Sequence, residues 1–233
     1  MRDLETYVNL NSYQDKSIVC VIPTRGMVDV RVVDSWFKLI TPINHKFTKL
    51  FMANGDLDNA YNTAIITILN HPELKDRRWV LTMEDDNIPP PDGILKLVDS
   101  MLENNNEFRA ISGTYWTKPS RDVIEHAPIA FGCPDIGEWN MMAPPLTEDG
   151  SVVPCCLIPL GFTLIDTNVF RELEYPWFKT LEQHDTSRGI FEQNVGATPD
   201  SYFFQKMWQK NMKIGCRGDI KVGHLDSKTN QIW

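Results

Sequence analysis

The stretch WVLTMEDDNIPPPD, residues 79–92, joins an apolar run to three consecutive acids and then to three prolines. Residues 79–83 have the composition of a buried strand, because no charge interrupts them and aromatic and β-branched residues favour strands. Glu84, Asp85 and Asp86 follow at once. Three like charges beside a buried strand repel one another and resist leaving water. We therefore expect these acids to face a bound group at the end of that strand.

Strand-like apolar segments alternate with amphipathic helical segments on both sides of this stretch. Residues 17–24, SIVCVIPT, are typical of a buried strand in a parallel sheet. A helix should open at Pro91, since proline suits the first helical turn. The first helix is expected to bury Val30, Val33, Trp36, Phe37 and Ile40. In chain order we expect strands at 17–24, 49–53, 78–83 and 109–116, with helices at 30–40, 57–69 and 91–102 between them.

This alternation predicts an α/β fold, a Rossmann-like mixed sheet that is mainly parallel and has helices on both faces. Ligands of such sheets bind beyond the carboxyl ends of the strands. Polar clusters follow three of the predicted strands, so they should meet at one edge of the sheet. The clusters are Pro23, Thr24 and Arg25; Asn54, Gly55 and Asp56; and Glu84, Asp85 and Asp86.

The alternation stops after residue 116. Residues 117–160 are rich in proline and glycine, which predicts loops and short strands. Residues 161–173 indicate a strand entering a short helix, with Asp166 or Thr167 as its N-cap. A helix that buries Phe203 and Phe204 and closing strands that end at His224 complete the chain. We expect one domain over residues 1–233, with halves at 17–116 and 117–226.

Composition excludes several classes of protein. The chain has 233 residues, 42% of them hydrophobic, and a net charge of −8, which disfavours unspecific binding to nucleic acid or to an anionic membrane. The sequence shows neither a signal peptide nor an apolar run of membrane-spanning length, so a cytoplasmic protein is expected. The five cysteines include no CxxC pair, which predicts reduced thiols without a zinc knuckle.

The acidic cluster has the chemistry of a divalent metal site. Carboxylates at a ligand-binding edge are unfavourable unless a cation offsets them, and hard oxygen ligands favour magnesium or manganese. His224 ends a predicted strand and could reach the same edge, although a lone histidine is more often structural. A site with both carboxylate and imidazole favours Mn²⁺ over Mg²⁺.

Asp200, in GATPDSYFF, has two interpretations. An aspartate near a helix start commonly caps the helix or interacts with its dipole. Its alternative role is that of a general base that takes a proton from a hydroxyl group.

Taken together, these segments resemble the GT-A fold glycosyltransferases of the inverting, metal-dependent family 2 type. The resemblance covers most of residues 17–226, and the ordered set is more specific than any single motif. VCVIPTRG resembles that family's nucleotide-binding opening, and MEDDNIPPPDGIL resembles its DxD region. GFTLIDTNVFREL resembles the acceptor-side segment, and TPDSYFFQKMWQKNMKI with DIKVGHL resembles the part with the catalytic base and the late metal-binding histidine.

The resemblance implies transfer of a sugar from a UDP- or GDP-sugar to a hydroxyl acceptor, with inversion and with Mn²⁺ or Mg²⁺ as cofactor. The acceptor would be a glycan, a protein or a modified nucleic acid. The half at 17–116 would bind the nucleotide sugar, and the half at 117–226 would bind the acceptor and hold the base. The implied sites are Pro23, Thr24, Arg25, Asn54, Asp56, Asn62, Glu84, Asp85 and Asp86 for the nucleotide sugar, Asp86 and His224 for the metal, and Asp200 for catalysis.

The chain departs from the family pattern at several positions. Glu84 stands where aspartate is usual, Tyr61 where arginine is frequent, and Pro199 where a second acid is common. A QxxRW-type segment is absent, which argues against a processive polysaccharide synthase.

Three other functions remain open from the sequence. A nucleotidyltransferase that makes sugar nucleotides would share the metal-bound diphosphate, but PTRGMVD lacks a glycine-rich phosphate loop. A retaining transferase would not need Asp200. A non-catalytic module that binds nucleotide sugar or glycan would keep the fold without turnover.

Some features near the predicted site have both a structural and a functional interpretation. Residues 182–198 could form a lid over the donor. Trp116, Trp139 and Trp177 could stack on sugar rings, although tryptophans are more often in the core. The cations Lys206, Lys210, Lys213, Arg217 and Lys221 could form a phosphate-facing patch, but a solvated helix face is the stronger interpretation.

Overall fold

The computed structural model of the protein describes residues 15–53, 55–103, 107–117, 127–132, 134–181 and 198–233. No helix within these residues is long and apolar enough to cross a membrane. The helices are α2 (Val30–Lys38), α3 (Leu57–Asn70), α4 (Gly93–Glu103), α5 (Val169–Glu172) and α6 (Pro199–Gln209), with a 3₁₀ turn at Pro134–Ile136. The strands are β1 (Ile18–Thr24), β2 (Phe47–Ala53), β3 (Trp79–Met83), β4 (Asn87–Ile88), β5 (Phe108–Thr114), β6 (Trp116–Thr117), β7 (Ala127–Pro128), β8 (Val153–Cys155), β9 (Phe162–Asp166), β10 (Lys213–Lys221), β11 (Gly223–Asp226) and β12 (Gln231–Ile232).

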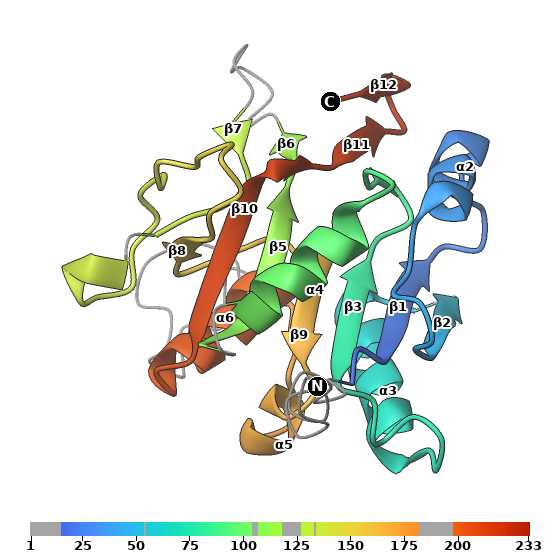
Figure 1. Ribbon diagram of the computed structural model, residues 1–233, viewed down its shortest axis with the longest axis horizontal. Helices are drawn as coiled ribbons and strands as arrows, with labels where there is room; N and C mark the ends of the chain where they lie inside the picture. Colours follow the sequence, from blue (N-terminus) through green and yellow to red (C-terminus); the bar gives the residue numbers. More distant parts are fainter. Residues whose placement is uncertain (1–14, 54, 104–106, 118–126, 133, 182–197) are drawn as a thin grey trace, which may run out of the picture.

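A seven-stranded mixed sheet in the order β2-β1-β3-β9-β5-β10-β8 forms the centre of the fold. The strands β2, β1, β3, β5 and β10 run in one direction, whereas β9 and β8 run antiparallel to their neighbours. Figure 1 shows the arrowheads of β3 and β5 pointing to the same edge. The α/β fold with a mainly parallel sheet is therefore confirmed, and strands from both halves of the chain contribute to it.

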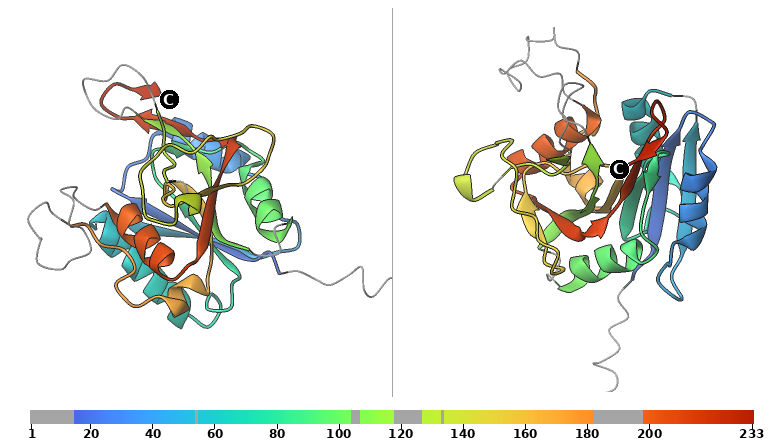
Figure 2. Two further views of the ribbon diagram at one scale, coloured as in Figure 1. Left: turned by 90° about the vertical axis from the view of Figure 1, so that its left-hand side faces the viewer. Right: turned by 90° about the horizontal axis from the view of Figure 1, so that it is seen from above.

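Each face of this sheet is covered by its own apolar core. In β1, Val19 and Val21 point to the core that contains α3 and α6, because side chains alternate along a strand. Ile18, Cys20 and Ile22 point to the other core, which contains α2 and α4. The right-hand view of Figure 2 shows α4 and α6 on opposite sides of the strands. Such double coverage explains why β1 and β3 contain no charged residue and are almost entirely apolar.

Two local expectations were wrong. The helix α2 buries Val32, Ser35 and Trp36. Val30, Phe37 and Ile40, which we expected to be buried, are 76%, 84% and 49% exposed, and Ile40 lies beyond the end of the helix. The N-cap of α5 is Asn168 rather than Asp166 or Thr167. Asp166 contributes instead by accepting a hydrogen bond from the Asn168 backbone N–H at 2.8 Å, because its side chain reaches over the turn.

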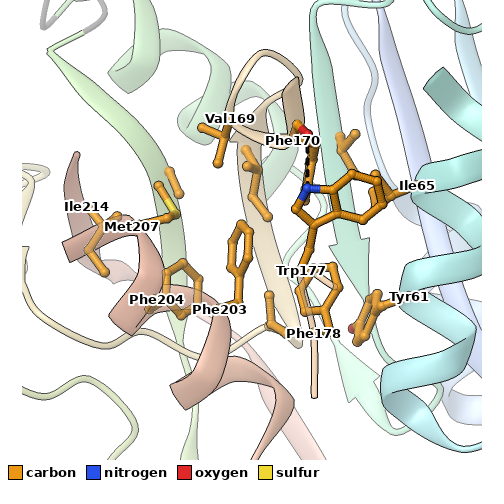
Figure 3. Close-up of a cluster of buried hydrophobic side chains, with 14 of the residues drawn as sticks. Tyr61, Ile65, Val169, Phe170, Trp177, Phe178, Phe203, Phe204, Met207 and Ile214 are labelled. Atoms are coloured by element: carbon orange, nitrogen blue, oxygen red, sulfur yellow. Dashed lines mark hydrogen bonds between the residues drawn. The ribbon is translucent and has the colours of Figure 1, made fainter. Parts of the chain in front are cut away.

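A cluster of aromatic side chains lies between α6, α3 and the segment after α5 (Figure 3). The ring of Phe203 stacks on Phe178 and Phe170, with centroid separations of 4.7 and 5.5 Å. Phe178 in turn contacts the ring of Tyr61 at 4.9 Å. Trp177 donates its indole N–H to the Phe170 carbonyl at 2.9 Å. The cluster therefore fixes the position of α6, whose first turn contains Asp200.

The described cysteines agree with the prediction of reduced thiols. Cys20 and Cys216 are free thiols, and these two residues, Cys155 and Cys156 are all buried. Burial raises the pKa of the Cys20 thiol and that of the Cys216 thiol to about 12. Cys133 lies outside the described residues.

The substitution Phe203→Ala tests the aromatic cluster. Removing a fully buried ring that stacks on two others should lower the free energy of unfolding by about 3–5 kcal/mol. Urea denaturation followed by circular dichroism measures this loss. The matched control is Phe37→Ala, at a ring that is 84% exposed, where a change within about 0.5 kcal/mol is expected. Equal losses in the two variants would contradict the role assigned to the cluster.

Candidate active site

The predicted polar clusters meet at the carboxyl edge of the sheet. Glu84, Asp85 and Asp86 follow β3, and β3 pairs in parallel with β1, which ends at Thr24. The Arg25 backbone N–H donates to the Asp85 carboxylate at 3.1 Å, so the ends of the two strands are joined directly. The Gly26 N–H donates to the Thr24 hydroxyl at 3.1 Å and shapes the turn after β1. Asp85 therefore holds the loop after β1 in place.

Glu84 is in the most crowded electrostatic environment of the three acids. Its backbone N–H donates to the Gly161 carbonyl at 3.2 Å, and its carboxylate accepts a hydrogen bond from the buried Tyr61 hydroxyl at 3.3 Å. Burial, followed by the charges of Asp86 and Asp200, raises the pKa of Glu84 to about 8, although the Tyr61 hydrogen bond opposes this. The side chain is consequently protonated at neutral pH unless a cation lies beside it.

Asp86 and His224 lie side by side, as we predicted for a pair of metal ligands. The Nε2 atom of His224 is 3.6 Å from the Asp86 Oδ2 atom. The β-bridge between His224 and Asn87 brings β11 next to β4, and the Leu225 N–H donates to the Asp86 carbonyl at 2.8 Å. The Asp86 Oδ1 atom is buried and has no hydrogen-bond partner within the described chain. Backbone pairing between β11 and β4 therefore holds the Asp86 carboxylate next to the His224 imidazole. The Asp86 Oδ1 atom remains a buried acceptor without a partner in the described chain.

The donor set here is compatible with a metal that has other ligands as well. Among the described residues, no group of three or more histidine, cysteine, aspartate and glutamate side chains has a metal-binding arrangement. One carboxylate and one imidazole match the chemistry of Mn²⁺, which accepts both oxygen and nitrogen ligands. The unpartnered Asp86 oxygen is the kind of atom that a cation satisfies. The residues therefore fit a cation that completes its coordination with water and a ligand's phosphate oxygens.

Asp200, in the first turn of α6, lies close to these acids. Its charge contributes to the raised pKa values of Glu84, Tyr61 and Tyr115. The Asp200 carboxylate accepts hydrogen bonds from the Thr198 hydroxyl and, at 2.9 Å, from the Ser201 N–H. Burial nevertheless raises the pKa of Asp200 above its ordinary value. The α6 helix, which comes late in the sequence, thus brings a further carboxyl group close to Glu84 at this edge.

Three residues of this site were missed in the sequence. Tyr115 has its ring centroid 5.1 Å from that of His224, and Asn87 is fully buried with both amide atoms unpartnered in the described chain. Gly161 allows this arrangement, because a Cβ atom there would lie 2.5 Å from the Asn87 Oδ1 atom and 2.7 Å from the Tyr115 ring. Asn87 directly follows the acids, and Tyr115 follows a strand. Their position at strand ends was a usable signal for both.

The remaining nucleotide-site candidates have different environments. Pro23 is the penultimate residue of β1 and pairs in register with Met52 of β2. Asp56 is the exposed N-cap of α3 without a side-chain capping bond. Asn62 is buried, and its amide bonds to the backbone of Trp177 and Phe178 at 2.7–3.2 Å, which is a structural use. Asn54 and the predicted lid at 182–197 lie outside the described residues.

Four of the five cations predicted around α6 and β10 have partners within the described residues. Lys213 pairs with Glu107, Lys221 with Glu148 at 2.7 Å, and Arg217 with Asp219 at 2.7 Å. Lys206 donates to the carbonyls of Glu174 and Pro176. Among the tryptophans, Trp177 is buried in the core, whereas Trp116 is 41% exposed. These contacts favour the structural interpretation of the cations and of Trp177.

The raised pKa of Glu84 predicts a pH-dependent stability in the metal-free protein. The unfolded chain loses this proton near pH 4.5, whereas the folded protein keeps it to about pH 8. The free energy of unfolding should therefore fall as pH rises through this window. With EDTA at pH 8, Glu84→Gln should be more stable than the unchanged protein by roughly 2 kcal/mol or more, because each unit of pKa is worth about 1.4 kcal/mol.

Urea denaturation at pH 4 and pH 8 measures this effect, and the two proteins should have similar stability at pH 4. The control is Glu103→Gln, at an exposed position at the end of α4, which should leave the pH dependence unchanged. A Glu84→Gln variant with the unaltered pH slope would contradict the assignment.

Comparison with solved structures agrees with the fold. No family model and no curated protein sequence matches the chain. Among solved structures, A197 from STIV is similar at 15% identity, with 93% of this chain and 92% of that chain covered and a TM-score of 0.60. GalNAc-T7, crystallised with UDP, GalNAc and Mn²⁺, is similar at 10% identity, with 89% of this chain and 43% of that chain covered and a TM-score of 0.54. This chain thus spans less than half of that GalNAc-T7 chain, and it has the GT-A fold.

Proposed function

We propose that the protein is a glycosyltransferase that transfers a sugar from a nucleoside diphosphate sugar to a hydroxyl group of an acceptor. The convergence of Glu84, Asp86, Asp200 and His224 at the carboxyl edge of the sheet is the observation on which this proposal depends. Ligands of open α/β sheets bind at this edge. The GT-A fold and the UDP, GalNAc and Mn²⁺ in the GalNAc-T7 structure support the same chemistry.

Asp86 and His224 are the residues that would hold a Mn²⁺ or Mg²⁺ ion in this proposal. When bound, the ion acts as a Lewis acid toward the diphosphate leaving group. Asp86 offers a buried oxygen without a partner, and His224 offers its Nε2 atom 3.6 Å from the Asp86 Oδ2 atom. Asp85 contributes indirectly, because it positions the backbone at Arg25 beside the nucleotide-binding end of β1.

Asp200 would act as the general base. A buried carboxylate with a raised pKa is a stronger base than one in water, so it accepts the proton of an attacking hydroxyl more readily near neutral pH. The Thr198 hydroxyl and the Ser201 N–H orient its carboxylate. Attack from the face opposite the diphosphate would invert the anomeric carbon. An inverting transfer is therefore the mechanism that we propose.

The substitution Asp200→Asn tests the base while keeping the shape of the side chain. Donor binding should stay within about twofold, whereas kcat should fall by about 10²–10⁴-fold, the usual contribution of a general base. The measurements are calorimetric binding of UDP- and GDP-sugars and a turnover assay with the donor that binds. The matched control is Asp34→Asn, at an exposed aspartate of α2 that pairs with Lys38, and it should retain full turnover.

Unchanged turnover in Asp200→Asn would overturn the inverting mechanism and favour a retaining transferase. Donor binding without turnover in the unchanged protein, across a range of hydroxyl acceptors, would favour a binding module. Release of pyrophosphate from a nucleoside triphosphate and a sugar phosphate would instead identify a nucleotidyltransferase.

Manganese binding provides a separate test of the metal pair. In the presence of UDP or GDP, Mn²⁺ titrated into the protein should produce heat of binding, and Asp86→Asn should weaken that binding by at least about tenfold. Loss of one charged ligand removes a hard oxygen contact that the remaining imidazole cannot replace. Asp226→Asn, two residues beyond His224, is the control and should bind Mn²⁺ normally. An absence of heat with both nucleotides would contradict the metal site.

A further inference from the structure

A hollow lies at the edge of the sheet opposite the candidate active site, and the proposed glycosyl transfer does not use it. It has a volume of about 480 Å³ and opens beside the turn before β3 and the turn between β9 and α5. In Figure 1 this is the lower end of the sheet, where α5 lies. Its walls contain four cationic side chains, two acids and two neutral polar residues. They are Lys75, Arg77, Arg78, Arg171, Asp15, Asp76, Thr167 and Asn168.

Backbone contacts hold the two turns together around this hollow. The Thr167 N–H donates to the Arg78 carbonyl at 3.1 Å, which joins the end of β9 to the start of β3. The Arg171 guanidinium donates to the Lys75 carbonyl and, at 2.9 Å, to the Asn168 side chain. Cations from sequence positions almost a hundred residues apart are thus held on one cavity wall.

Two buried donors in the walls have no partner within the described residues. Arg77 is 8% exposed and its Nε atom is unbonded, and Thr167 is 1% exposed and its hydroxyl is unbonded. A buried N–H or O–H group without a partner is unfavourable by about 1–3 kcal/mol, and more so when it is charged. Buried polar groups of native proteins are generally paired with protein, water or a ligand. Arg77 and Thr167 both line the hollow, so their unsatisfied donors lie in the residues that form its walls.

The charges of the walls favour an anion. Four cations against two acids give a formal charge of 4 − 2 = +2, in a chain whose total is −8. Within the described part of the chain, Lys75, Arg77 and Arg171 form no ion pair with a carboxylate. The Asp15 carboxylate is occupied by the Ser17 N–H and hydroxyl at 2.9 and 2.8 Å, and Asp76 is the other acid present. Lys75, Arg77 and Arg171 are thus the cations of the walls that can offer positive charge to a ligand.

We propose that this hollow binds the phosphate group of a small molecule, either free phosphate or a phosphate monoester. A phosphate dianion matches the formal charge of the walls, and its several oxygens can accept from guanidinium, ammonium and hydroxyl donors that surround it. The site is separate from the proposed donor site, because Arg78 and Glu84 flank opposite ends of β3. Six residue steps at about 3.3 Å each place roughly 20 Å between them.

The test is titration of inorganic phosphate into the full-length protein, followed by calorimetry and by amide NMR shifts, with chloride at equal ionic strength as reference. Phosphate should bind and shift the amide signals of Thr167 and Asn168. Glucose 6-phosphate and unphosphorylated glucose are the second and third ligands. Tighter binding of glucose 6-phosphate than of phosphate would assign the site to a monoester, and the reverse order to free phosphate, while glucose should not bind here.

The double variant Lys75→Gln/Arg171→Gln removes two exposed cations of the walls and should weaken phosphate binding by at least about tenfold, as expected when charge-assisted hydrogen bonds are lost. The control Lys38→Gln/Lys228→Gln removes the same charge elsewhere and should leave affinity unchanged. Thr167→Val tests the buried hydroxyl at constant volume and should weaken binding as well. The proposal is overturned by absent binding, by equal losses in both double variants, or by shifts confined to the segment 84–86 and His224.

Discussion

Confinement of several carboxyl groups at one sheet edge is the constraint on which the rest of this structure depends. Burial opposes the ionisation of Glu84, and the nearby charges of Asp86 and Asp200 strengthen the effect. Such a group of acids is stable only with bound protons or with a cation nearby. Without a metal, the raised pKa of Glu84 keeps its carboxyl group protonated at neutral pH, and a bound cation would allow that group to ionise. This electrostatic arrangement is also what a diphosphate-binding metal site requires.

The aromatic cluster and the small C-terminal sheet hold these groups in place. Tyr61 contacts Glu84 through its hydroxyl and Phe178 through its ring, and Phe178 stacks on Phe203 of α6. One continuous set of contacts therefore connects the acid after β3 with the helix of Asp200. On the other side, β11 pairs with β4 and aligns His224 with Asn87, the residue next to Asp86. Packing on both sides therefore keeps the acids Glu84, Asp86 and Asp200 close together, although their like charges repel one another.

The two edges of the sheet differ in charge. The carboxyl edge gathers acids around His224, whereas the opposite edge gathers Lys75, Arg77, Arg78 and Arg171 around a hollow. An acidic site attracts cations and, through them, diphosphates, and a basic hollow attracts anions directly. The proposed anion site therefore lies in a chain whose net charge is −8, so the net charge alone does not indicate it. The sequence around β3 contributes to both charges, because Arg77 and Arg78 precede the strand and the three acids follow it.

The sequence by itself determined the alternation of strands and helices, the parallel character of the sheet and the edge to which the acids belong, because local periodicity reports burial. The pairing of Asp86 with His224 was predicted through a family resemblance, and the 3.6 Å geometry agrees with it. Tertiary structure alone decided that β9 inserts antiparallel between β3 and β5, and that α2 leaves Val30 and Phe37 exposed. It also decided that the Asn62 amide binds backbone and that Tyr115 lies against His224. These features depend on which distant segments pack together, and the periodicity of a single segment contains no information about its partners.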